Sequence, residues 1–481
     1  MLRRSESLLA AAACLLLAAA APGEPARWYG IFASDGSRIG HAAREVVERP
    51  GGREIVESYT IRIQEEDQPP TAISGRTVRR EDRRGRTLSI AEEARNGARS
   101  TRIQVVVRAG RAEATRRTGA STDTESIALA ETVRFDDGEG LLARWNPEAT
   151  PRLEFDAFNA SAMSVDHVVV EALRGAARDS AGRLPVLRRR YERGELRGIS
   201  RLLIDRAGAI VEIEQPMFGG TIRWRAIDRQ AALRPATAYS ALRAALIRAP
   251  YRLTESALEG HLRYRFGYRD GISFPLPRTG EQRAAAAPEG VTLDICGACG
   301  PGLATDPATL ADALRPTAWL QSGDRRLRAI AEPVARLAIS GTRKMEMLRA
   351  RTEPYLARID FTGHFSALET LSRRAGDCTE AAVLLAALGR AAGIPTRVAS
   401  GLVYSRQRYH GVSNVFIPHS WVLAYVDGRW RSFDAALGQF DATHIALTIG
   451  DGDARSIAAA GQLAGLLEWQ EMSEVRPRPS P

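Results

Sequence analysis

The stretch that decides the fold of the C-terminal third, residues 376–395, reads GDCTEAAVLLAALGRAAGIP. Alanine and leucine favour a helix, Asp377 is a typical N-cap residue, and Gly393 with Pro395 predicts the helix end. Cys378 is therefore predicted to open this helix. At that position the helix dipole and the exposed backbone N–H groups favour thiolate over thiol, and the same amides can receive an oxyanion.

Two strands further along the chain carry groups that could activate a thiol. His419 begins one predicted strand, Asp434 follows the next, and Asp427-Gly428 is the predicted hairpin turn between them. Adjacent antiparallel strands can bring the two side chains together. A thiol nucleophile needs a base within reach, and that imidazole needs an acceptor on its other nitrogen. The pattern predicts Cys378 as nucleophile, His419 as general base and Asp434 as the group that orients the histidine.

In the order of these elements, the sequence resembles the transglutaminase-like superfamily. The resemblance covers about 329–452 and rests on the GDC and GIP motifs, the HSW that starts at His419, and the GRW before Asp434. It implies a papain-like α+β domain and places the family's nucleophile on Cys378, its base on His419 and its acid on Asp434. One departure concerns 361–366, FTGHFS, where no side-chain oxyanion donor is recognisable. Only the backbone amide of Cys378 can be named for that role.

The implied reaction class is acyl transfer from an amide to a cysteine thiol. With water as acceptor the enzyme is a peptidase or amidase, and with an amine it is a transglutaminase. The expected partner is a peptide or protein substrate, and no cofactor or metal is expected. An alternative is a catalytically idle scaffold that binds peptides or envelope partners. Another is a carrier or chaperone activity in the N-terminal region.

Several other residues have two interpretations. Glu380 is a second acceptor near the thiol or, as we favour, a first-turn acid that suits the helix dipole. For His444 with Asp441 a structural role is favoured over a catalytic one. Trp421 and Trp430 are expected in the core, not as a platform for substrate.

The cysteines separate into three groups. Cys14 lies in an N-terminal apolar run and is expected to be removed with it. Cys296 and Cys299 have the spacing of a redox pair, but they follow a strand and no helix starts there, so a local disulfide is favoured. Zinc would need two further ligands, and the sequence has no second cysteine pair or compact histidine cluster. Cys378 is left as a thiol.

The N-terminus and the charge predict the compartment. Arg3 and Arg4 precede an apolar run over 8–21 that ends in small residues, which is typical of a secretory signal peptide over 1–23. The run is too short to span a membrane, and no comparable run follows, so the mature protein is predicted to be periplasmic or secreted without a transmembrane segment. The net charge of +10, from 67 basic and 57 acidic residues, is interleaved along the chain. This pattern predicts a solvated basic surface that could associate weakly with anionic surfaces, and no nucleic-acid binding.

The length of 481 residues predicts several domains. Period-two apolar patterns indicate a β-rich antiparallel domain over 24–235. A small β unit or linker with the cysteine pair is predicted over 236–305. The transglutaminase-like α+β domain is predicted over 306–472, where helical periodicity appears on one face from Leu327 to Ala338. A disordered tail is predicted over 473–481.

Overall fold

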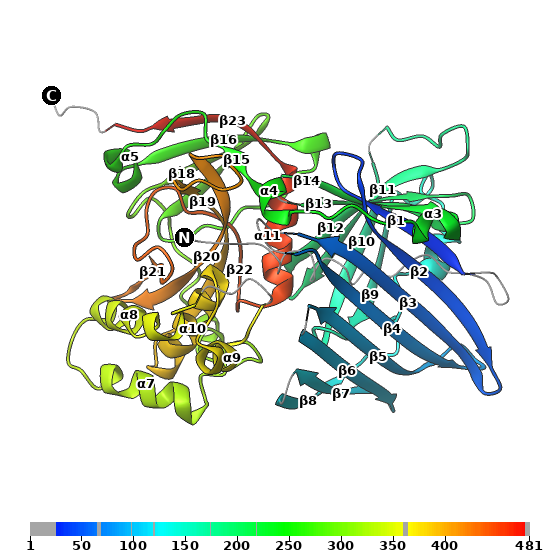
Figure 1. Cartoon of the computed structure of the whole chain (residues 1–481), viewed down its shortest axis with the longest axis horizontal. Coiled ribbons are helices and arrows are strands. Elements are labelled where there is room, and N and C mark those ends of the chain that lie inside the picture. The colour runs from blue at the N-terminus through cyan, green and yellow to red at the C-terminus, as the bar shows by residue number, and fades with distance from the viewer. Residues whose placement is uncertain are drawn as a thin grey trace. The chain divides into compact units, whose positions relative to one another are not determined.

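The computed structural model describes residues 26–64, 69–97, 99–118, 121–173, 175–217, 219–358 and 364–476 (Figure 1). The predicted signal peptide lies outside these residues, as does the end of the predicted tail. The described chain divides into two compact units. One comprises 26–216 and 220–241, and the other comprises 242–476 with Met217 and Gly219. No helix in this part of the chain is both long and apolar enough to cross a membrane.

The first unit is built on one antiparallel sheet, as the period-two patterns predicted. Its order among the described residues is β8-β7-β6-β5-β4-β3-β2-β1-β14-β13-β12-β11-β10-β9, with β1 paired to β14 at the centre. The strands are β1 (Arg27–Phe32), β2 (Arg38–Arg49), β3 (Gly52–Ile63), β4 (Thr71–Asp82), β5 (Thr87–Asn96), β6 (Arg99–Arg108), β7 (Arg111–Thr118), β8 (Ser121–Ala128), β9 (Arg152–Asn159), β10 (Ser164–Ala172), β11 (Leu184–Glu192), β12 (Glu195–Ile204), β13 (Ile210–Met217) and β14 (Gly220–Ile227).

Both ends of this long strand order contribute to one apolar core. Ile90 and Val105 from β5 and β6 pack in the same cluster as Phe158 and Met163 from β9 and the turn after it. A sheet of this length twists, and the twist allows its distant strands to face each other. Short helices α2 (Glu139–Leu142) and α3 (Arg229–Leu233) lie in the same unit.

The second unit contains two smaller sheets and most of the helices. One sheet has the order β15-β20-β19-β22, with β21 paired to β20, and the other has the order β17-β18-β16-β23. The strands are β15 (Ile247–Arg248), β16 (Leu262–Tyr268), β17 (Gln282–Ala287), β18 (Gly290–Ile295), β19 (Thr396–Ser405), β20 (Val415–Val426), β21 (Arg429–Phe433), β22 (Ile445–Gly450) and β23 (Leu467–Glu474). The helices are α4 (Ala241–Ala245), α5 (Glu255–Glu259), α6 (Pro307–Asp312), α7 (Arg325–Ala335), α8 (Gly341–Ala350), α9 (Ala367–Arg373), α10 (Cys378–Ala391) and α11 (Ala454–Leu466).

Helix α10 is the centre of the second unit. It packs against β19, β20 and the helices α7, α8 and α9 (Figure 1). Leu384 and Leu388 from α10 share a core with Val422 and Ala424 from β20. A helix that is apolar on every side is a buried helix, which is what its alanine- and leucine-rich sequence forms here.

The predicted helical face from Leu327 to Ala338 is correct only in its first part. Leu327, Ala331 and Val334 are buried on α7, but the helix ends at Ala335. Leu337 lies beyond that end and is 39% exposed. The apolar spacing continues beyond the end of α7, and Arg336 at the C-cap gives no strong stop signal. The sequence pattern therefore predicted a helix that is too long.

The segment 236–305 is integrated with the chain that follows it. Its strand β15 pairs with β20, and its strands β16, β17 and β18 form a sheet that is completed by β23. β23 also includes Ser473 and Glu474, the first two residues of the predicted disordered tail.

The predicted local disulfide joins Cys296 to Cys299 just after β18. The loop is held by backbone hydrogen bonds to the segment before β17. The N–H of Cys296 donates to the carbonyl of Glu281 at 3.1 Å, and that of Gly300 donates to the carbonyl of Gly280 at 3.0 Å.

The end of α10 yields a stability prediction. The buried guanidinium of Arg390 pairs with Asp451 at 2.5 Å and donates to the carbonyls of Thr396 and Arg315. Arg390→Met should lower the free energy of unfolding by about 3–5 kcal/mol, because it leaves buried acceptors without donors. Arg397→Met is the control, since Arg397 contacts the same Asp451 with its side chain 19% exposed. It should cost about 1 kcal/mol or less. Urea unfolding measures both, and equal losses would contradict the argument.

Candidate active site

Cys378 is the first residue of α10, as predicted. Asp377 is its N-cap, and the Asp377 carboxylate accepts the N–H of Thr379 at 2.7 Å. The Cys378 side chain is buried, with 5% exposure, and it remains a thiol because the disulfide joins the other two described cysteines. The position lies at the positive end of the helix dipole, where a thiolate is favoured.

Glu380 ties the start of α10 to the segment before α9. One carboxyl oxygen accepts the N–H of Asp377 and the other accepts the N–H of Phe365, both at 2.9 Å. Burial raises the pKa of Glu380 well above its usual range, and the neighbouring Asp377 raises it further. Glu380 is in the first turn, as predicted, but it is fully buried and its carboxyl group binds backbone amides. From the sequence we favoured a role for Glu380 as an acid that suits the helix dipole. Its hydrogen bonds to the backbone amides of Phe365 and Asp377 were not predicted.

His419 on β20 and Asp434 after β21 lie side by side. The His419 Nε2 and the Asp434 Oδ2 are 2.6 Å apart, and both side chains are fully buried. The other oxygen of Asp434 accepts the N–H groups of Ala436 at 2.7 Å and Leu437 at 3.0 Å. Because Nε2 faces the carboxylate, Nδ1 is the ring nitrogen that could take a thiol proton.

Asp434 stays ionised in this buried position. Burial by itself raises the pKa of a carboxyl group. The charge and hydrogen bonds of His419 and His444 outweigh that effect and hold the pKa of Asp434 well below its usual range. A fixed negative charge next to the histidine is what the predicted orienting acid requires.

A second histidine contacts the same carboxylate oxygen. The His444 Nε2 lies 3.0 Å from the Asp434 Oδ2, and the His444 Nδ1 lies 3.0 Å from a carboxylate oxygen of Asp441. The sequence singled out His444 with Asp441, but it did not predict the contact with Asp434. His444 directly precedes β22, and β22 pairs with β19, which in turn pairs with β20.

The predicted residues therefore fall into two groups. His419 and Asp434 are in direct contact, and Cys378 opens the helix that packs against the strand carrying His419. The role of Cys378 stays a prediction. Trp421 and Trp430 are each 1% exposed and pack in a core cluster, as expected.

Among the residues that the structure describes, two groups of side chains have a spacing that could suit a metal ion. Ligand atoms of His419, Asp434 and His444 lie within 4.8 Å of one another, as do those of His261 and the cysteine pair. In the first group both Nε2 atoms lie at hydrogen-bond distance from one carboxylate oxygen. In the second group the sulfur atoms form the disulfide, so they are not available as thiolate ligands.

Two residues that were not singled out from the sequence, Glu281 and Gln282, form hydrogen bonds to the strands next to the site. The Glu281 carboxylate accepts the backbone N–H of Ser432 at 2.8 Å and its hydroxyl at 2.9 Å. The Gln282 side-chain amide donates to the carbonyl of Ala446 at 3.0 Å and accepts its N–H at 2.8 Å. Ser432 precedes Asp434 by two positions, and Ala446 follows His444 by two. No local sequence signal marks these long-range contacts.

Solved structures that resemble this chain have low similarity scores. A β-barrel-like protein with a domain of unknown function from Brucella abortus is 14% identical, with a TM-score of 0.32 over 42% of this chain and 95% of that one. A candidate cysteine protease from Cytophaga hutchinsonii is 17% identical, with a TM-score of 0.26 over 46% and 91%. The periplasmic domain of TgpA from Pseudomonas aeruginosa is 17% identical, with a TM-score of 0.26 over 47% and 83%.

No curated protein matches the chain. One family model does match, and it is described as the transglutaminase-like superfamily. It covers 337–435, the segment that includes Cys378, His419 and Asp434. The chain therefore contains a transglutaminase-like domain over 337–435.

Proposed function

We propose that this protein is an exported thiol enzyme that transfers acyl groups from amide bonds, with Cys378, His419 and Asp434 as its catalytic residues. The observation that carries the proposal is the buried contact of 2.6 Å between His419 and Asp434, within the family-matched segment that contains Cys378 at a helix N-terminus. The proposed compartment is the periplasm or the exterior of the cell. The Cys296–Cys299 disulfide supports this, because disulfides persist in oxidising compartments.

The proposed reaction has two steps. His419 takes the thiol proton on Nδ1, and the Cys378 sulfur attacks the amide carbonyl, while Asp434 holds the other ring nitrogen. The tetrahedral oxyanion is received by the backbone N–H of Cys378 at the start of α10. Collapse breaks the C–N bond, the amine leaves with the proton from His419, and an acyl-thioester remains. Water or a second amine, activated by His419, then releases the acyl group and restores the thiol.

The buried charges favour an enzyme over an idle scaffold. A carboxylate that is fully buried and ionised is costly unless several donors satisfy it, and hydrophobic residues would often serve stability equally well. A scaffold that only binds peptides has no need for such a group. Water and an amine are alternative acceptors for the same acyl-thioester. Peptidase, amidase and transglutaminase activity therefore all follow from the proposed mechanism.

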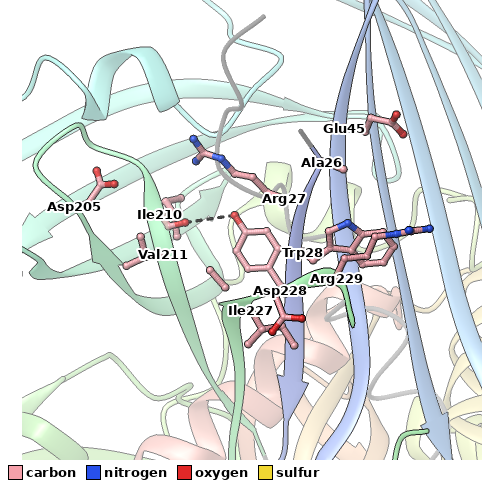
Figure 2. A pocket seen from close by; sticks show the side chains of 12 residues that line it. Ala26, Arg27, Trp28, Glu45, Asp205, Ile210, Val211, Ile227, Asp228 and Arg229 are labelled. Carbon is pink, nitrogen blue, oxygen red and sulfur yellow. Dashed lines mark hydrogen bonds between the residues drawn. The ribbon is translucent and has the colours of Figure 1, made fainter. Parts of the chain in front are cut away.

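A carrier role for the first unit receives less support. One pocket of this unit, with a volume of about 730 Å³, lies near the start of β1 and beside Ile210 (Figure 2). Its lining is mixed, with charged side chains such as Arg27 and Asp228 next to apolar ones such as Trp28 and Ile227. A carrier of apolar ligands would need a mostly apolar hollow.

The first test compares substitutions within the catalytic set. Cys378→Ala removes the atom that becomes acylated, so turnover should vanish while the melting temperature changes little. Asp434→Asn should lower kcat/KM by roughly 10–10³, because it gives His419 the wrong hydrogen-bond partner. Assays should follow both peptide hydrolysis and incorporation of a labelled primary amine in envelope extracts. If the wild type shows neither reaction and Cys378→Ala retains the phenotype and partner binding, the idle scaffold is correct.

The second test needs no substrate. The Cys378 thiol should react with iodoacetamide at pH values well below the ~8.5 typical of a free thiol, because the helix terminus and His419 favour the thiolate. His419→Ala should move the reaction profile to higher pH. Peptide mapping by mass spectrometry identifies the labelled cysteine. A profile like that of free cysteine in both proteins would refute the pairing of Cys378 with His419.

A further inference from the structure

Asp434 accepts a hydrogen bond at every position its carboxylate offers. One oxygen binds the amides of Ala436 and Leu437, and the other binds the Nε2 atoms of both His419 and His444. A carboxylate has about four acceptor positions, so this set is complete. An orienting acid for one histidine needs only one of them for the ring. The contact with His444 is therefore additional to the proposed reaction.

His444 has the environment of a cation. Its two ring nitrogens face Asp434 and Asp441, each at 3.0 Å. Burial lowers the pKa of a histidine, but the hydrogen bonds and charges of these two carboxylates outweigh burial and raise the pKa of His444 to about 9. Its ring is enclosed by those of Trp421 and Phe440, with centroids at 5.1 and 4.8 Å.

The other titratable groups around His444 can be named. From β20, His419 faces it across the shared carboxylate, with ring centroids 5.6 Å apart. From β16, the Tyr264 hydroxyl donates to the carbonyl of Ala442 at 3.0 Å. Burial raises the pKa of Tyr264 well above its usual range, so this phenol is neutral when His444 titrates. Asp434 and Asp441 are thus the charges that hold the His444 proton.

The contact of Asp434 with both histidines changes how strongly Asp434 attracts the proton of His419. A carboxylate that faces one imidazole holds a proton on that ring strongly. A carboxylate that also faces an imidazolium attracts the first proton less, because the second cation offsets part of its charge. In acyl transfer His419 must both accept a proton and release it to the leaving amine. A weaker hold on the His419 proton favours the release.

We propose that His444 is a positioning residue that acts through Asp434, fixing this carboxylate and moderating its attraction for the His419 proton. By doing so, His444 sets the upper pH limit of the thiol chemistry. The inference rests on the proposed function in its catalytic part. Its structural part, a cationic His444 bound between two carboxylates, rests on these contacts and on the raised pKa of His444. The two parts can be tested separately.

The catalytic part is tested by the pH profile of His444→Gln. Glutamine can still donate a hydrogen bond to Asp434 but carries no charge. The alkaline limb of kcat/KM should move to higher pH by roughly one unit, because Asp434 then holds the His419 proton more tightly. A loss of fold alone would lower the rates without moving the limb. An unmoved limb in a folded variant would overturn the proposal.

Two further variants keep the test decisive. Asp441→Asn removes the second partner of His444 and should move the limb in the same direction by a smaller amount, which provides the answer if His444→Gln does not fold. His167→Gln is the matched control. His167 is exposed on β10 of the first unit, and its loss should leave the profile unchanged. A shift in the control equal to that of His444→Gln would refute a specific role.

The structural part is tested by melting temperature against pH. The pKa of His444 is about 9 in the folded protein and is near 6.5 in an unfolded chain, so its contribution is complete below about pH 6.5 and is lost as the pH rises to about 9. The wild type should lose more melting temperature across that window than His444→Gln. Equal slopes would overturn the cationic His444. A steeper wild-type slope without any thiol reaction would instead show that the proposed function fails while the network stands.

Discussion

Most of the arrangement in the second unit depends on keeping one carboxylate ionised without water. Asp434 is fully buried, and a buried charge is unfavourable unless nearby donors replace its hydration. Four donors do so, from β20, from the turn after β21 and from the residue before β22. The three segments must therefore keep a fixed relative position. The site therefore depends on the relative positions of these strands as well as on its own side chains.

The second sheet of this unit supplies that fixed position. Its edge strand β17 begins at Gln282, and Glu281 and Gln282 bind the strands on both sides of the carboxylate. Behind them, the disulfide loop binds the backbone of Gly280 and Glu281. Glu281 and Gln282, in the segment predicted as a small β unit or linker, thus bind the strands next to Asp434. A charge that must not move needs such contacts, because side chains on a loose strand would admit water.

The parts of the site that could be predicted are those with local signals. Asp377 and Cys378 were placed by capping and helix propensity, and the turn at Asp427 and Gly428 has the positive φ angles, 50° and 79°, that this dipeptide favours. The contacts of Glu281 could not be found in this way, since they join positions 151 residues apart. The same holds for β1 and β14, whose pairing no period-two pattern encodes. Local chemistry specifies elements, and the partners of those elements depend on the whole chain.

The strand β23 has a consequence for the order of events in the cell. It completes the sheet that begins at β16, and in this unit it is synthesised after every other element. Pairings between segments so far apart form late, because the intervening chain must first be brought together. Cys378 leaves the ribosome well before β23, the strand that completes this sheet. The nascent chain therefore carries the Cys378 thiol before the sheet that β23 completes has formed.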